Sequence, residues 1–400
     1  MKVALYKPET DEVDVNVVAY ANEAWLNLRG CIENPSECGG KRGPNEPKKP
    51  FNVFFCKKGS ECWNFFRTSI IGTAPSGHEW IASHYAVFMH WGGHIHFGDG
   101  LDRYATPYYD ILEQRSFPLE QYGVQDLASH IERWIDAGAY VMLDADTGKL
   151  IENPEFRIHE LLMYGYDEER RIFYSPLQNG RTGKFEEFEL RYDTVLAAVE
   201  SVIAYYREYP LERVKRACQY FYPLTTIKIR AAHYDDTLFI LMALKKLEAE
   251  YTGYRREFVR YEQTREAGEC FVNYTGLGCL IGMRDVLAGL ISTPDVGLSF
   301  SIGTSLFKLY EHRGILVSTL ELLRDKLGIS DTAYDSGLET YKARSGIMRE
   351  AYLLMKKAEI SNKKNSLPGI IQRLDAVYES DYTSLRDMAS IARQALAGRL

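Results

Sequence analysis

The sequence has few cysteines, no long apolar run and no excess of basic residues. Its 400 residues include seven cysteines, an odd number in a chain large enough to bury its own cores, so we expect reduced thiols rather than disulfide cross-links. The net charge is −7 with both signs interspersed, which argues against nucleic acid as a partner. No signal-peptide pattern opens the chain, and no stretch of about 18 apolar residues occurs after it. We therefore expect a cytoplasmic protein without a membrane partner.

Internal repeats of solenoid period are also lacking, and the only compositionally biased stretch is a Gly- and Pro-rich segment at 36–49, which we interpret as a surface loop. Solenoid and fibrous architectures are therefore not expected. A chain of this length favours two globular domains.

Periodicity predicts an α+β arrangement in the first half of the chain. The run HEWIASHYAVFMHW predicts a buried helix over 78–91, and the pattern at 123–138 predicts an amphipathic helix that ends at Gly138. AYVMLDAD, at 139–146, reads as a strand. Three strand-like runs within 157–190, separated by turn signals, predict an antiparallel meander.

The character of the sequence changes after the meander. Pro210 and Pro223 flank a short connection, strand signals become scarce, and helical spacing of leucines dominates the rest of the chain. Such helices need a shared core. We predict an α+β domain over 1–208 and an all-helical domain over 209–400.

The segment GAYVMLDADTGKLIENPEFRIHELLMYGYDEERRIFYSPLQNGRTGKFEEFEL resembles the butirosin-biosynthesis H family. In that family a strand after a helix leads through a loop to the pattern H-x-L-L-x-Y-G-Y-D, which His159 begins here. FKLYEHRGILVSTLELL and ETYKARSGIMREAYLLMKKAEISNKK resemble the helical tail of such proteins. The resemblance spans roughly residues 75–380.

The resemblance implies a papain-like or cysteine-peptidase-like N-terminal domain with an antiparallel sheet, followed by an all-α domain. It implies transfer of an acyl or aminoacyl group from a thioester to an amine, in the biosynthesis of an antibiotic or other peptide natural product. The implied partners are an acyl or peptidyl carrier protein and a small-molecule amine. No cofactor is expected, and a homodimer is left open.

The same resemblance nominates the site residues. His159 is the implied base. Laying HEWIASHYAVFMHWGG on the family's nucleophile helix puts Glu79 at the position of the cysteine. Ser175, which precedes Pro176, takes the position where the family often has an orienting Asp. Cys56 and Cys62 are candidates for a displaced nucleophile, because two lysines that follow Cys56 can favour its thiolate. Glu79 could instead serve as acid or base for an amine that attacks the thioester directly.

We expect His159 to lie on a central strand at the rim of the principal cleft, within reach of Glu79 or Ser83. A partly buried imidazole needs a polar partner, even where it is not catalytic. The structural alternatives are a histidine satisfied by a neighbour, a carboxylate that interacts with a helix dipole, and inert thiols.

Two other functions stay open. A peptidase-like fold that has lost its cysteine could hold a peptide, a carrier protein or another enzyme as a scaffold. A metal-binding protein is the second, since His90, His94 and His96 are spaced so that three imidazoles could meet. Ring stacking or satisfied core histidines would explain the same cluster without a metal.

Overall fold

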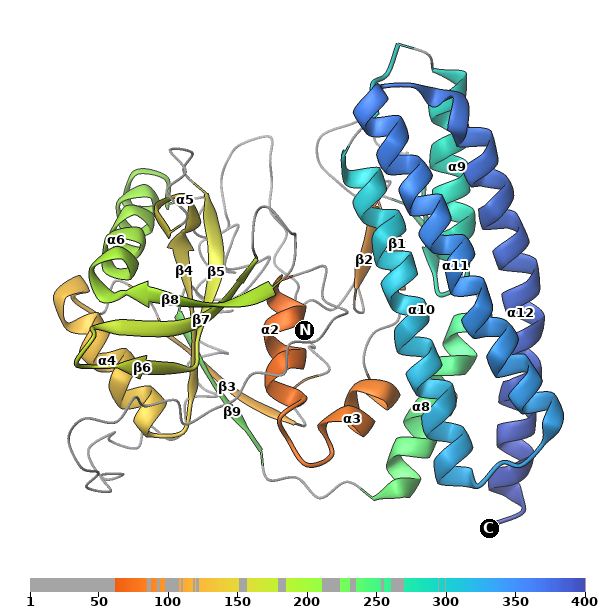
Figure 1. The fold of residues 1–400 in the computed structure, drawn as a ribbon, viewed down its shortest axis with the longest axis horizontal. Coiled ribbons are helices and arrows are strands. Elements are labelled where there is room, and N and C mark those ends of the chain that lie inside the picture. Colours follow the sequence, from red (N-terminus) through yellow and green to blue (C-terminus); the bar gives the residue numbers. More distant parts are fainter. Residues whose placement is uncertain are drawn as a thin grey trace. The chain divides into compact units, whose positions relative to one another are not determined.

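The structure is a computed structural model that describes residues 62–84, 88–91, 94–97, 108, 111–117, 119, 122–150, 157–178, 185–210, 224–230, 235–252, 255–259, 270–293, 295–298 and 300–399. These residues form two compact units, which are drawn in Figure 1. The sheet unit comprises the described residues within 109–230. The helical unit comprises those within 56–108, 231–260 and 268–400, so it brackets the sheet unit in the sequence.

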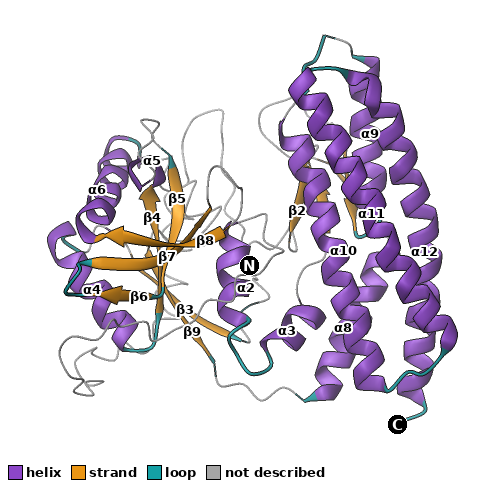
Figure 2. Ribbon diagram, in the orientation of Figure 1, coloured by secondary structure: helices purple, strands orange, loops and turns teal. Residues whose placement is uncertain are grey.

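The sheet unit combines two antiparallel sheets with three helices in its described part (Figure 2). The four-stranded sheet has the order β3 (Leu112–Phe117), β9 (Leu224–Ile229), β4 (Tyr140–Asp146) and β5 (Ile158–Met163). The three-stranded sheet has the order β6 (Gly165–Asp167), β7 (Ile172–Gln178) and β8 (Phe185–Arg191). The helices are α4 (Val124–Asp136), α5 (Thr147–Leu150) and α6 (Tyr192–Glu208).

The core of the sheet unit lies between the four-stranded sheet and helices α4 and α6. As predicted, α4 buries one apolar face, with Leu127, Ile131 and Ile135 inside, and the chain leaves it through Gly138 at a φ of 85°. The strand predicted at 139–146 forms as β4, which is buried along its whole length. Truncating Ile131 to alanine should cost about 2–5 kcal/mol, because the site cannot collapse fully around the cavity.

The helical unit is built around three long helices that follow one another, α10 (Phe300–Leu327), α11 (Thr332–Ser361) and α12 (Leu367–Ala397). Its remaining elements are α2 (Cys62–Ile71), α3 (Gly77–His84), α8 (Asp236–Thr252), α9 (Gly278–Ser292), the short 3-10 helix η3 (Lys364–Ser366), and a sheet of order β10 (Arg255–Val259), β11 (Cys270–Thr275), β1 (Phe88–Trp91) and β2 (His94–Phe97). Among the described residues, the search for a helix with the length and apolar character of a membrane span finds none.

Short connections make the long helices neighbours. Asp331 caps the start of α11 by accepting a hydrogen bond from the Ala333 backbone at 2.7 Å, and Asn362 ends that helix in the left-handed conformation. The leucine spacing that predicts helices in this half of the chain gives α10 a buried face, as Leu316 and Leu320 show. The mixed α/β composition, the antiparallel sheets and the helical C-terminal part are therefore as predicted.

The helix expected over 78–91 is only partly correct. The helix predicted over 78–91 ends at His84, and residues 88–91 form strand β1 instead, paired with β2 and β11. The apolar spacing in this run suits either structure, and pairing with distant strands decides it.

The prediction that residues 209–400 are all helical is also wrong, because β9, β10 and β11 lie within that range. β9 pairs with both β3 and β4, so it belongs to the sheet unit. The two units thus divide the chain differently from the expected boundary at 208/209.

The meander and the strand of His159 also differ in detail from expectation. The three-stranded antiparallel sheet exists, but its first strand is only β6, and the part that carries His159 separates as β5. β5 stands last in its sheet order rather than in the centre. Its residues Leu161 to Met163 are nevertheless fully buried, so layers above and below the strand account for its apolar character.

Candidate active site

His159 lies near the start of β5, with 45% of its side chain exposed. Its Nδ1 atom lies 3.2 Å from Oε2 of Glu160 and 3.4 Å from the Glu160 carbonyl oxygen. The ring can donate a hydrogen bond to the Glu160 carbonyl in the tautomer that has the proton on Nδ1. A neutral ring in this state has its lone pair on Nε2, which is the nitrogen suited to act as a base.

Glu160 lies directly opposite Asp144 of β4 in the strand register. Both residues are buried, at 9% and 5% exposure. Oδ2 of Asp144 accepts a 2.7 Å hydrogen bond from the Tyr206 hydroxyl on α6. Directly opposed residues have Cβ atoms about 5 Å apart, and like charges in that arrangement destabilise a sheet. Glu160 is thus the carboxyl group in contact with the imidazole, and Asp144 lies opposite it in the register.

Asp146 fixes the backbone that leads to His159. Its Oδ1 atom accepts hydrogen bonds from the backbone N–H groups of Gly148 and Arg157, both at 3.1 Å, and its Oδ2 atom accepts one from Ser201 of α6 at 3.1 Å. The carboxylate therefore ties the end of β4 to α6 and to the residue two positions before His159. Such support is what holds a functional side chain in one orientation.

Ser175 lies on β7 and His159 on β5, and the expected role of Ser175 as the orienting group of His159 stays a prediction. Ser175 is fully buried, and the hydrogen bond from Tyr164 N to Tyr174 O sets it beside Tyr164. Five residues of extended chain, roughly 16 Å, separate Tyr164 from His159 along the strand direction. The structure gives His159 a polar partner in Glu160, which the sequence signals only as the second residue of a His-Glu pair.

Glu79 and Ser83 belong to the helical unit, whereas His159 belongs to the sheet unit. Glu79 lies in the first turn of α3, where a carboxylate interacts favourably with the helix dipole. The Ser83 hydroxyl donates to the Glu79 carbonyl at 2.7 Å and lies 2.7 Å from Nδ1 of His84. The proposed pairing of His159 with this segment stays a prediction.

The cysteine and histidine candidates are only partly within the described structure. Cys62 is the first residue of α2, although its side chain lies outside the described ones, and Cys56 lies outside the described residues altogether. The backbone register pairs His90 with Ile95, but the side chains of the predicted histidine cluster lie outside those described. Among the side chains that the structure does describe, no group of three or more His, Cys, Asp or Glu could hold a metal ion.

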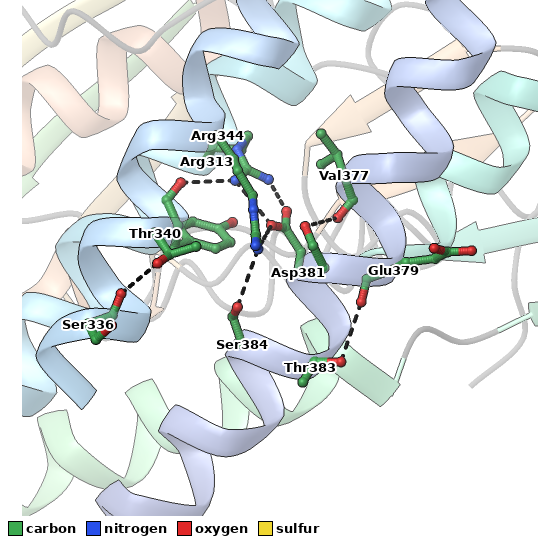
Figure 3. A network of polar contacts seen from close by, with 11 residues as sticks. Arg313, Ser336, Thr340, Arg344, Val377, Glu379, Asp381, Thr383 and Ser384 are labelled. Carbon is green, nitrogen blue, oxygen red and sulfur yellow. Dashed lines mark hydrogen bonds and ion pairs between the residues drawn. The ribbon is translucent and has the colours of Figure 1, made fainter. Parts of the chain in front are cut away.

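A second buried polar cluster lies in the helical unit, centred on Arg313 of α10 and Asp381 of α12 (Figure 3). The two form a bidentate ion pair, and the guanidinium also donates to the Tyr341 carbonyl at 3.0 Å and covers that residue's ring. Burial raises the pKa of Asp381, against the opposing effect of Arg313 and Arg344. The buried carboxylate of this cluster has a counter-charge in contact with it, which is the arrangement of a structural ion pair.

Two further buried charges join helices of the same unit. Nε2 of His312 lies 2.8 Å from Glu250 of α8. The Lys246 ammonium donates to the Ala82 carbonyl at 3.1 Å and to the Thr319 hydroxyl at 3.0 Å, and Thr319 donates to the same carbonyl at 2.6 Å. These contacts tie α3, α8 and α10 together, so we assign them to the packing of the helical unit.

No protein-family model matches this chain, and no curated protein matches its sequence. The resemblance to the butirosin-biosynthesis H family therefore stays a prediction. Among the described side chains, His159 presents an imidazole that contacts the Glu160 carboxyl group and is nearly half exposed.

Proposed function

We propose that the protein is an acyl- or aminoacyl-transfer enzyme in which His159 is the general base. The observation that supports this proposal is the half-exposed imidazole whose Nδ1 atom is held by the Glu160 carboxylate. A base needs an accessible nitrogen and a second nitrogen fixed by an acceptor, as in His–carboxylate pairs of hydrolases and transferases.

The proposed reaction moves an acyl group from a thioester to a primary amine. Nε2 of His159 takes a proton from the neutral attacking amine as the amine nitrogen forms a bond to the thioester carbonyl carbon. The carbon–sulfur bond then breaks, and the leaving thiolate takes up the proton that the imidazolium returns. The products are an amide and a free thiol, and no oxidant or metal is needed for the balance.

The resemblance noted in the sequence supports the substrate class: a thioester on an acyl or peptidyl carrier protein and a small amine acceptor of a natural-product pathway. A base with a carboxylate partner suits direct attack by the amine as well as a covalent route. A covalent route would add an acyl-enzyme on a thiol, with Cys62 or Cys56 as its carrier.

The test is amide formation from a panel of short acyl and aminoacyl thioesters of N-acetylcysteamine with a panel of primary amines, followed by mass spectrometry. We expect transfer by the wild-type protein and a loss of about 10²–10⁴-fold in rate for His159→Gln, the usual contribution of a general base. His130→Gln is the matched control, because it removes another half-exposed histidine of the sheet unit. A rate equal to background for the wild type, or an unchanged rate for His159→Gln, would favour the scaffold function.

The route is tested by intact mass after brief exposure to the thioester alone. A gain of one acyl group that disappears in Cys62→Ala or Cys56→Ala would demonstrate covalent catalysis. Transfer without any such gain, and with both alanine variants fully active, would demonstrate direct attack.

A further inference from the structure

Helix α11 exposes a line of residues directly opposite its buried face. Met348 and Met355 are completely buried where the helix packs against α10 and α12 (Figure 1). At 3.6 residues per turn, Gly346, Leu353 and Lys357 lie on the opposite side of the helix, and all three are exposed. This outward face therefore remains accessible to a partner after the helical unit has folded.

The residues of this face are arranged symmetrically about Leu353, which is 51% exposed. Glu350 and Lys357, which carry opposite charges, lie about 5 Å along the helix axis on either side of a point just beyond Leu353. Gly346 and Ile360 lie about 10 Å on either side of Leu353, and Ile360 is 88% exposed. Single apolar side chains on a surface are ordinary. A symmetric order of opposite charges and of unequal sizes is what a surface needs in order to pair with a copy of itself.

We propose that α11 is the contact face of a homodimer in which the α11 helices of two copies pack antiparallel around a twofold axis near Leu353. In this arrangement Glu350 of each copy lies at the level of Lys357 of the other, so the ion pair forms twice. Ile360 of each copy lies at the level of Gly346 of the other. A Cβ atom at Gly346 would meet no other atom within 4 Å, so the glycine leaves room for that isoleucine. The two Leu353 side chains meet at the centre.

The charges decide the direction of the two helices. A parallel pair in register would place Glu350 against Glu350 and Lys357 against Lys357, and like charges at an interface cost free energy. An antiparallel pair joins opposite charges at the same two levels. Within its own chain Glu350 contacts Arg373 of α12 at 3.3 Å, yet 62% of its side chain is exposed, so its carboxylate can also accept from the second copy.

The test is the mass of the full-length protein, measured by sedimentation velocity over a range of concentrations. We expect the wild type to change from one chain to two as the concentration rises. Leu353→Glu places two carboxylates at the centre of the contact, and we expect it to raise the dissociation constant by about 30-fold or more. Leu241→Glu is the matched control, because Leu241 is 50% exposed on α8 and lies outside this face. A wild type that stays monomeric, or a Leu353→Glu variant that dimerises like the wild type, would refute the proposal.

Charge reversal tests the antiparallel direction. Glu350→Lys or Lys357→Glu alone places like charges at two levels, and we expect each to weaken dimerisation by about tenfold. The double variant restores opposite charges and should dimerise nearly as the wild type does. Arg373→Gln is the control for Glu350→Lys, since it removes the same contact within the chain and leaves the charge that faces Lys357 in place. A double variant that dimerises no more tightly than the single ones would overturn the antiparallel arrangement.

Discussion

The two units bury carboxyl groups in opposite ways. In the helical unit, Asp381 is enclosed with a guanidinium that matches its charge and geometry, and a second arginine lies 3.8 Å away. In the sheet unit, Asp144 and Glu160 lie opposite each other, and their nearby partners include a hydroxyl and an imidazole. The ion pair of the helical unit fixes how two helices pack, whereas the carboxyl groups of the sheet unit contact a hydroxyl and a half-exposed ring.

The largest effect should come from breaking the matched pair. Arg313→Met leaves the Asp381 carboxyl buried without its main counter-charge, and we expect a loss of about 3–5 kcal/mol in the free energy of unfolding. Circular dichroism during denaturant titration measures it. The double variant Arg313→Met with Asp381→Leu is the control, and it should recover most of the loss, because neither charge of the pair is left behind. A double variant as unstable as the single one would show that the pair does more than balance charge.

A smaller effect is expected where one carboxylate serves several backbone donors. Asp146→Ala leaves the N–H groups of Gly148 and Arg157 without their shared acceptor, and we expect a loss of about 1–3 kcal/mol. Hydrogen exchange should also accelerate at Arg157, two residues before His159. Ser201→Ala removes only the bond to α6, so it should leave that exchange rate nearly unchanged.

The smallest effect concerns His130, a second histidine of the sheet unit. His130 lies in an aromatic cluster of the sheet unit, 4.7 Å from the Tyr122 ring, and its Nδ1 atom is 2.9 Å from Arg133. Burial lowers its pKa, and the neighbouring guanidinium lowers it further. The unfolded chain therefore binds the proton more readily, so the contribution of His130 to stability is complete above pH about 6.5 and is lost as the pH falls toward the lowered value.

Because the ring is partly exposed, solvent screening should limit this contribution to a few tenths of a kcal/mol. The measurement is the difference in unfolding free energy between wild type and His130→Gln at about pH 7.5 and pH 5.5. The variant should lose less on acidification than the wild type. Equal losses in both proteins would rule out His130 as a source of the pH dependence.

The sequence predicts those parts of the fold whose pattern is local. α4 and β4 carry one clear apolar face or run each, and both form as expected. β9 could not be foreseen, because its partners in β3 and β4 lie some 80 to 117 residues earlier and no local sequence pattern indicates such a pairing. His159 was recognisable from the sequence as a candidate, but its partner was not, since the burial of Glu160 depends on its register with β4.

The carbonyl of Ala82 finds its partners far along the chain, at Lys246 and, 237 residues later, at Thr319. At typical elongation rates of about 5–20 residues per second, roughly 10–50 seconds pass between the synthesis of the first and the last of these residues. During that interval α3 has emerged, and the whole described part of the sheet unit follows it from the ribosome. Helix α3, which carries the completely enclosed Trp80, contacts α8 and α10 in the finished fold. The nascent chain therefore carries α3 for this interval without the two helices that it packs against.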